Sequence, residues 1–205
     1  MKKIEITRRR LGVLGLATLT ASFVGAGQAE AADAAVASIQ RYYTRLIATM
    51  QAASSLSVQA RYQRLAPVLS EAFDFSTMAR LSVGPAFNSA TGAQQAAIRQ
   101  AFEKFIGAFY ANRIDGYSSE QFEVDPVVEN RGGQRVVKTK LVRPGGGSTR
   151  IDYLMNGTRV IDIYLDGSIS EVASRRGEFS SIIASGGPDA LIKALRDKTA
   201  QLLGG

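Results

Sequence analysis

The 205-residue chain contains no histidine, no cysteine and no tryptophan. Without histidine or cysteine it cannot build a zinc finger, a Ser-His-Asp or Cys-His catalytic arrangement, or a haem site ligated by either residue. Carboxylates, lysine, tyrosine and hydroxyl groups are the side chains that remain for chemistry. The chain also cannot form disulfides, so its cysteine usage does not indicate a compartment.

The first 31 residues indicate the compartment instead. Residues 1–10 (MKKIEITRRR) are basic, residues 11–27 are apolar, and Ala29 and Ala31 suit an A-x-A cleavage site. This order is typical of a bacterial secretory signal peptide. We therefore expect a signal peptide over residues 1–31, a single domain over residues 32–205, and export to the periplasm by Sec or, given TRRRLG, by the twin-arginine route. The alternative is an uncleaved N-terminal anchor, for which the apolar run is short and rich in glycine.

Removal of the expected signal peptide changes the charge of the chain. The whole chain carries +7, and residues 1–31 hold five basic and two acidic residues, so the mature chain carries +4. This modest basic balance suits transient contact with an anionic membrane surface. No cluster of lysine and arginine is interleaved with aromatic residues, so nucleic acid is not an expected partner.

Apolar residues recur at spacings of three and four in the first half of the mature chain, which predicts helices. Residues 57–73 give one such pattern, in which Pro67 is expected to kink or split the helix. A short helix is expected from Phe75, with Asp74 as its N-cap and its end at Gly84. The earliest helical face comprises Val36, Ile39, Tyr43, Leu46 and Met50.

Thr91 and Gln94 have the spacing of a capping box and predict the start of a further helix. This helix is the most aromatic of the sequence, so we expect it to lie against the core. Its apolar face comprises Ile98, Phe102, Phe105 and Phe109.

From about residue 120 the hydrophobic period changes from helical to two, which predicts four short strands. The strands are QFEVDPVVENRG, QRVVKTKLVRPG, STRIDYLMN and TRVIDIYLDG, and the glycine-rich turns between them favour antiparallel hairpins. A sheet with one apolar face needs a layer of helices to cover it. The apolar face is expected to include Ile151, Tyr153 and Met155 on the third strand and Ile161, Ile163 and Leu165 on the fourth.

Two helices are expected at the C-terminus. The second begins at Gly187-Pro188-Asp189, because proline suits the first helical position and an acid suits the first turn. The first, over residues 169–184, places small residues beside large apolar ones, which either leaves room for a ligand or allows close helix packing without a cavity. Its apolar face comprises Ile169, Val172, Phe179, Ile182 and Ile183.

Candidate catalytic groups are few. Asp152 and Asp162 lie on neighbouring predicted strands and could share acid and base roles. The favoured alternative is that they lie on the solvent face or bond to backbone and arginine groups. The segments GGPD and PGGG do not match a phosphate-binding loop, and Ser180 and Ser181 have no base beside them. We therefore expect no catalytic residue, no metal site and no cofactor.

Four stretches resemble one known family. They are FDFSTMARLSVGPAFNSATGAQQAAIRQAFEKFIGAFY, RIDYLM, TRVIDIYLDGSIS and RRGEFSSIIASGGPDALIKALRDK. Together they cover about residues 36–203 and resemble the MlaC-like toluene-tolerance family of periplasmic lipid-shuttle proteins. The family's tryptophan before the last strand is replaced by Thr158-Arg159, and the DGSIS turn is one residue longer. The hopanoid-associated, HpnM-like branch of the family is the one that these features resemble more closely: that turn, the GEF segment and the C-terminal LLGG.

The resemblance implies an α+β fold, in which helices cup a curved four-stranded antiparallel sheet around an apolar pocket, as in NTF2-like cones. It also implies a non-catalytic carrier that takes a phospholipid or a hopanoid between the inner and outer membranes. Its partners would be an inner-membrane lipid transporter and an outer-membrane protein, and the bound lipid would be cargo rather than a cofactor.

The residues expected to line the lipid pocket come from the aromatic helix, the sheet and the helix over residues 169–184. Two rivals remain open: a ligand-free scaffold with a well-packed interior, and an NTF2-like enzyme with Asp152 or Asp162 facing inward. The expected lining residues are Phe105, Phe109, Tyr110, Val137, Leu141, Tyr153, Met155, Ile161, Ile163, Leu165, Ile169, Val172, Phe179, Ile182 and Ile183.

Overall fold

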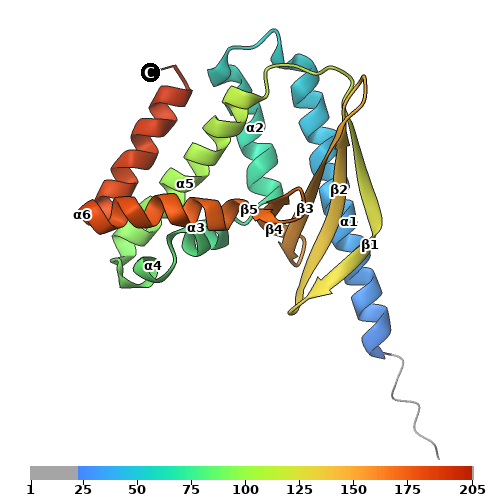
Figure 1. Cartoon of the computed structure of the whole chain (residues 1–205), viewed down its shortest axis with the longest axis horizontal. Helices are drawn as coiled ribbons and strands as arrows, with labels where there is room; N and C mark the ends of the chain where they lie inside the picture. Colours follow the sequence, from blue (N-terminus) through green and yellow to red (C-terminus); the bar gives the residue numbers. More distant parts are fainter. Residues whose placement is uncertain (1–22, 205) are drawn as a thin grey trace, which may run out of the picture.

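The computed structural model describes residues 23–204, so most of the expected signal peptide, residues 1–22, lies outside the described part of the chain. Within that part, none of the helices is both long and apolar enough to cross a membrane. Figure 1 shows helices gathered on one side of a twisted antiparallel sheet. The elements are α1 (Phe23–Ala53), α2 (Val58–Ala72), α3 (Phe75–Val83), α4 (Pro85–Ser89), α5 (Gly92–Arg113), β1 (Gln121–Arg131), β2 (Gln134–Val142), β3 (Ser148–Asn156), β4 (Arg159–Leu165), β5 (Ile169–Ser170) and α6 (Glu171–Leu202).

The predicted helix caps are present. Asp74 accepts a hydrogen bond from the Thr77 backbone N–H at 2.9 Å and so begins α3. Thr91 and Gln94 form the reciprocal capping box that begins α5. Each cap satisfies backbone donors that the first helical turn leaves without an internal partner.

Pro67 does not split α2, so that part of the prediction is wrong. The proline lies inside a helix that is continuous from Val58 to Ala72. Pro67 is exposed, whereas Leu65, Val68 and Leu69 on the other face are buried. Water can therefore solvate the carbonyl that loses its backbone partner, and packing of the apolar face holds the helix together.

The sheet has five antiparallel strands in the order β1-β2-β3-β4-β5, rather than the four expected. The four predicted strands are present, and the additional one is the two-residue β5, which is too short to show a hydrophobic period. Positive φ angles at Gly132 and Gly133 match the tight turn between β1 and β2.

A register shift in the β3–β4 pair corrects one predicted face. Leu154 pairs with Asp162, but Met155 pairs with Val160, so Ile161 is an extra residue in β4. A bulge of this kind changes which side chains alternate on a strand. Ile161 therefore packs with Val136 and Leu154 in a small cluster separate from the main core, whereas Ile163 belongs to the main core.

The two predicted C-terminal helices are the halves of α6. Gly186 and Gly187 have non-helical backbone angles and divide it, with Pro188 starting the second half. The first half begins at Glu171, where Ser170 caps the helix by accepting from the Ala173 N–H. Ile169 consequently lies in β5, 54% exposed, and not on the apolar helical face where it was expected.

The helices form a layer that covers the inner face of the curved sheet. α1 runs beside β1 and β2, while α5 packs between α2 and α6 (Figure 1). The main core is one cluster, to which α1, α2, α3, α5, α6 and the inner face of the sheet all contribute. The α+β class with a curved antiparallel sheet and covering helices is thus confirmed.

Candidate functional site

A cavity of about 370 Å³ lies between α1, α5 and the inner face of the sheet. Its volume falls within the range of about 300–1,000 Å³ that is usual for small-molecule sites. Most of its wall is aromatic or aliphatic, and its charged side chains are three arginines and one glutamate. The uncharged wall comprises Tyr42, Tyr43, Leu46, Met50, Phe73, Met78, Ile106, Phe109, Tyr110, Ile114, Phe122, Leu141, Ile151, Tyr153, Ile163 and Leu165.

Strand alternation explains the sheet side of the wall. Ile151 and Tyr153 project from β3 on one face, and Ile163 and Leu165 project from β4 on the same face. Leu141 near the end of β2 completes this side. These positions were all expected except Ile151, which shared the predicted face but was not placed in the site.

The α1 side of the wall was not predicted as part of a site. Tyr42, Tyr43, Leu46 and Met50 line the cavity from one face of α1. The spacing of Tyr43, Leu46 and Met50 marks a buried helical face. Core residues and cavity-lining residues are both buried, so hydrophobic periodicity does not distinguish them and could not identify this wall.

A chain of buried hydroxyl groups crosses the wall between α1 and the sheet. The Thr139 hydroxyl donates to the Ile151 carbonyl at 2.7 Å, and it lies 2.6 Å from the Tyr43 hydroxyl. The Tyr43 hydroxyl in turn donates to the Tyr153 hydroxyl at 3.0 Å. Tyr43 is therefore the middle member of the chain, with a partner on either side. Burial raises the pKa of Tyr43 to about 12, although its bonds to Thr139 and Tyr153 oppose that rise.

One end of the cavity is charged and open to water. Arg113 at the end of α5 and Arg143 after β2 are exposed, while Glu171 and Arg175 on the first half of α6 are half-buried. Arg175 lies 3.7 Å from Glu171, an ion pair of the i, i+4 type. None of the three arginines was named in the sequence prediction, since an isolated arginine at the end of an element has no recognisable pattern.

Several residues expected in the wall belong to the packed core instead. The structure places six of the fifteen in the cavity: Phe109, Tyr110, Leu141, Tyr153, Ile163 and Leu165. The first half of α6 places its small residues, such as Ala173, Gly177 and Ser181, on its exposed face, so they neither line the cavity nor pack against another helix. The buried core holds Phe105, Val137, Met155, Val172 and Phe179, and half-buried Ile182 and Ile183 pack against it.

The two aspartates weighed as catalytic groups are structural. Strand alternation turns Asp152 and Asp162 away from the cavity, because their neighbours Tyr153 and Ile163 line it. Asp152 accepts two hydrogen bonds from Arg150, at 3.0 and 2.5 Å. Both carboxylates are buried, so the expectation that they bond to arginine and backbone groups is correct, whereas exposure to solvent is not.

Asp162 fastens the start of α6 to the sheet. Its carboxylate accepts from the backbone N–H of Val172 at 3.0 Å and from the Ser170 hydroxyl at 2.6 Å. A carboxylate at a helix N-terminus also interacts favourably with the helix dipole. Among residues 23–204, no group of three His, Cys, Asp or Glu side chains could hold a metal ion.

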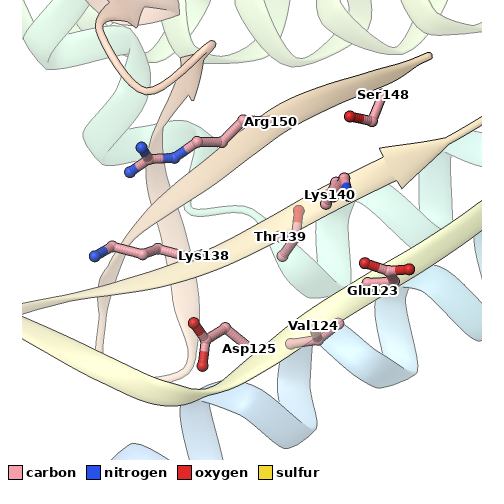
Figure 2. A pocket seen from close by; sticks show the side chains of 8 residues that line it. All are labelled: Glu123, Val124, Asp125, Lys138, Thr139, Lys140, Ser148 and Arg150. Atoms are coloured by element: carbon pink, nitrogen blue, oxygen red, sulfur yellow. The ribbon is translucent and has the colours of Figure 1, made fainter.

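A second hollow, of about 570 Å³, lies on the outer face of β1, β2 and β3 (Figure 2). Figure 2 shows the charged side chains of Glu123, Asp125, Lys138, Lys140 and Arg150 around it. Acids and bases are mixed and no apolar wall encloses the space. An acyl chain would gain little buried apolar area there, so the inner cavity is the better candidate.

Comparisons with known proteins agree with this architecture. The solved structure of the phospholipid-binding protein from Ralstonia solanacearum, described as being in complex with a phospholipid, superimposes with a TM-score of 0.71. The two chains share 21% identity over 82% of this chain and 98% of that one. No curated protein matches the chain. A sequence profile of the family described as MlaC protein matches residues 40–197, and the chain therefore belongs to the MlaC family.

Proposed function

We propose that the chain is a periplasmic lipid-transfer protein, which carries a phospholipid or a hopanoid between the inner and outer membranes without catalysing a reaction. The observation that carries this proposal is the inner cavity, whose wall is apolar over most of its area and charged at one open end. That distribution matches an amphiphile with its chain inside and its headgroup in water. The Ralstonia solanacearum relative, described as phospholipid-binding, supports the same cargo class.

The energetics favour a carrier that works with partners. Burial of one methylene is worth about 0.8 kcal/mol. A chain of a dozen methylenes therefore gains on the order of 10 kcal/mol before ordering costs are subtracted. The membrane offers the lipid the same gain, so extraction needs a docking partner that lowers the barrier. An inner-membrane lipid transporter and an outer-membrane protein would supply that step.

Export by the expected signal peptide is compatible with the cavity. The first fully buried side chain of α1 is Ala35, whereas Ala29 and Glu30 are exposed. Figure 1 shows the start of α1 projecting beyond the sheet. Cleavage after Ala31 would thus remove no part of the core and leave residues 32–205 as a single lipid-binding domain.

The two rival functions lack a supporting observation of this kind. A ligand-free scaffold predicts a well-packed interior, but the cavity occupies about 370 Å³. An enzyme of the same shape needs an acid or base within the cavity, and Asp152 and Asp162 lie on the other face of the sheet. The half-buried Glu171 is paired with Arg175 at the open end.

The test is to express the full chain, purify it from a periplasmic extract and identify the bound lipid by native mass spectrometry and extraction. We expect a cleaved protein with about one lipid bound. Met50→Trp should lower occupancy by filling the cavity, whereas Val127→Trp, at a site 72% exposed on β1, should not. A lipid-free mass that does not change after incubation with phospholipid and hopanoid vesicles would refute the carrier function.

A further inference from the structure

Two arginines at the open end of the cavity are held against the same aromatic ring. The guanidinium carbon of Arg113 lies 4.2 Å from the ring centroid of Phe109, and that of Arg175 lies 4.9 Å from it. The two guanidinium groups are therefore within about 9 Å of one another, the sum of the two distances. Guanidinium groups form paired hydrogen bonds to phosphate oxygens, and one phosphate can accept from a group on each side.

The charges at this end do not cancel. Arg175 has carboxylates nearby on Glu171, at 3.7 Å, and on Glu178, at 3.4 Å. Glu178 also pairs with Lys198. In the part of the chain that the structure describes, Arg113 and Arg143 have no carboxylate within ion-pair distance, so a surplus of two positive charges remains at the opening.

Arg143 completes the arrangement from the sheet side. It follows β2 in the turn to β3, and one of its terminal nitrogens donates to the Thr149 hydroxyl at 2.9 Å. That bond fixes the side chain beside the cavity while the second terminal nitrogen keeps its hydrogens for a ligand. Because Arg143 and Arg113 are exposed, a headgroup can reach both from water.

Tyr110 marks where the charged end meets the apolar wall. Burial raises the pKa of Tyr110, Glu171 and Tyr43 raise it further, and Arg175 and Arg113 lower it. The Tyr110 ring lies 6.0 Å from the Phe109 ring, edge to face, and both side chains line the cavity. A lipid with its headgroup at the arginines would have its chains along the apolar wall beyond Tyr110.

We infer that Arg113, Arg143 and Arg175 form a seat for the phosphate of a lipid with a net negative headgroup. This inference rests on the proposed function and adds a preference within it. Phosphatidylglycerol offers one uncompensated phosphate charge to the arginines. Phosphatidylethanolamine carries an ammonium that opposes the surplus positive charge, and diacylglycerol or an uncharged hopanoid offers no phosphate.

In the experiment, the full chain is purified after export, stripped of lipid and incubated with vesicles. The vesicles contain equal amounts of phosphatidylglycerol, phosphatidylethanolamine and diacylglycerol with identical acyl chains. Bound lipid is extracted and quantified. The native protein should enrich phosphatidylglycerol over phosphatidylethanolamine on the order of fivefold, as half-exposed charge pairs allow. The enrichment should fall as salt rises, because screening weakens such pairs.

The variant Arg113→Gln/Arg143→Gln should lose the preference for phosphatidylglycerol over phosphatidylethanolamine. Arg64→Gln/Arg196→Gln is the matched control, since both residues are exposed, lie outside the cavity wall and give the same change in net charge. Circular dichroism verifies that each variant folds. The salt dependence of the native protein tests the seat even if a variant does not fold.

The remaining outcomes distinguish failure of the phosphate seat from failure of the carrier function. Equal uptake of the two phospholipids by the native protein would overturn the phosphate seat and leave the carrier function standing. Uptake of none of these three lipids, together with no uptake from hopanoid vesicles, would overturn both. Loss of the preference in inorganic phosphate, but not in sodium chloride of the same ionic strength, would mean that the arginines bind the free anion as readily as a headgroup, which also overturns the inference.

Discussion

Replacing Tyr43 with phenylalanine tests its central place in the buried hydroxyl chain. In the native protein the Tyr43 hydroxyl donates to Tyr153 and lies 2.6 Å from the Thr139 hydroxyl, which donates to the Ile151 carbonyl. Tyr43→Phe removes the middle hydroxyl, so both of its hydrogen bonds are lost and the buried Tyr153 hydroxyl is left without this partner. Leaving a buried hydroxyl unsatisfied costs about 1–3 kcal/mol. We expect the free energy of unfolding to fall by about 2 kcal/mol, near the middle of that range.

Tyr153→Phe is the matched variant, because it removes the hydroxyl at one end of the chain. Tyr43 then keeps its hydrogen bond to Thr139, so only one bond is lost. Its cost should be only that of one ordinary hydrogen bond, about 0.5–1.5 kcal/mol. Both residues are almost completely buried, at 3% exposure each, so their apolar contributions are similar.

Urea unfolding of the lipid-free protein, followed by circular dichroism, resolves this difference. The expected order is native, then Tyr153→Phe, then Tyr43→Phe, with similar m-values. A cost for Tyr153→Phe that equals or exceeds that for Tyr43→Phe would refute the central place of Tyr43 in the chain. If neither variant loses stability, the hydroxyl groups contribute nothing net to folding.

Three further predictions concern α6 and pH. Asp162→Asn should cost about 1.5–3 kcal/mol in urea unfolding, since the charged acceptor of the Val172 N–H and the Ser170 hydroxyl is lost; a cost within error of zero would contradict the anchoring role. Gly187→Ala should lower the thermal midpoint, because φ is +69° and ψ is −170° there, a combination nearly restricted to glycine that costs alanine about 1–3 kcal/mol; an unchanged midpoint would mean that the break in α6 relaxes freely. Burial raises the pKa of Tyr43 above its usual value of 10, to about 12, so the folded state keeps a proton that the unfolded chain releases. Stability should therefore be complete below pH 10 and fall between about pH 10 and 12, as urea midpoints and tyrosinate absorbance can measure; a midpoint that rises over this range would contradict the sign.

Helix ends were predictable because their signals are local. The side chains of Asp74, Thr91 and Gln94 satisfy backbone groups within three residues of themselves, so short sequence spacings contain the whole interaction. Pro67 is the exception that shows the limit. Its effect depends on whether its own face is exposed, and the helix packing that decides this is not local.

Strand faces were predictable until the register changed. Period-two alternation placed Tyr153, Ile163 and Leu165 on the inner face, where they line the cavity. The same rule failed for Ile161. It is the extra residue in β4, and it shifts the alternation of side chains between the two faces of the sheet. A register shift depends on the pairing of two strands, so it has no signature in either strand alone.

The cavity itself could not be separated from the core by sequence. Phe105 and Phe109 are one helical turn apart on the same predicted face of α5, yet Phe105 is 4% exposed in the core while Phe109 lies half-buried in the cavity wall. Hydrophobic periodicity reports removal from water, which both positions share. Arg175 lies over both rings, 5.2 Å from the centroid of Phe105 and 4.9 Å from that of Phe109. What separates them is that Phe109 is one turn from the end of α5, where the cavity borders it and Arg113 lies over its ring.

The placement of polar groups explains how a wall with several tyrosines can still accept an apolar chain. An unpaired buried hydroxyl beside a methylene would cost free energy, because the group would lose its water without gaining a partner. Tyr43, Tyr153 and Thr139 are hydrogen-bonded to one another, and Thr139 also donates to the Ile151 carbonyl, so these hydroxyl groups have partners within the wall. The charged side chains lie instead at the open end, where the headgroup of the proposed lipid would stay in contact with water. The proposed lipid would therefore have one favourable orientation, with its headgroup at the arginines, and a partner that docks at that end would meet the headgroup first.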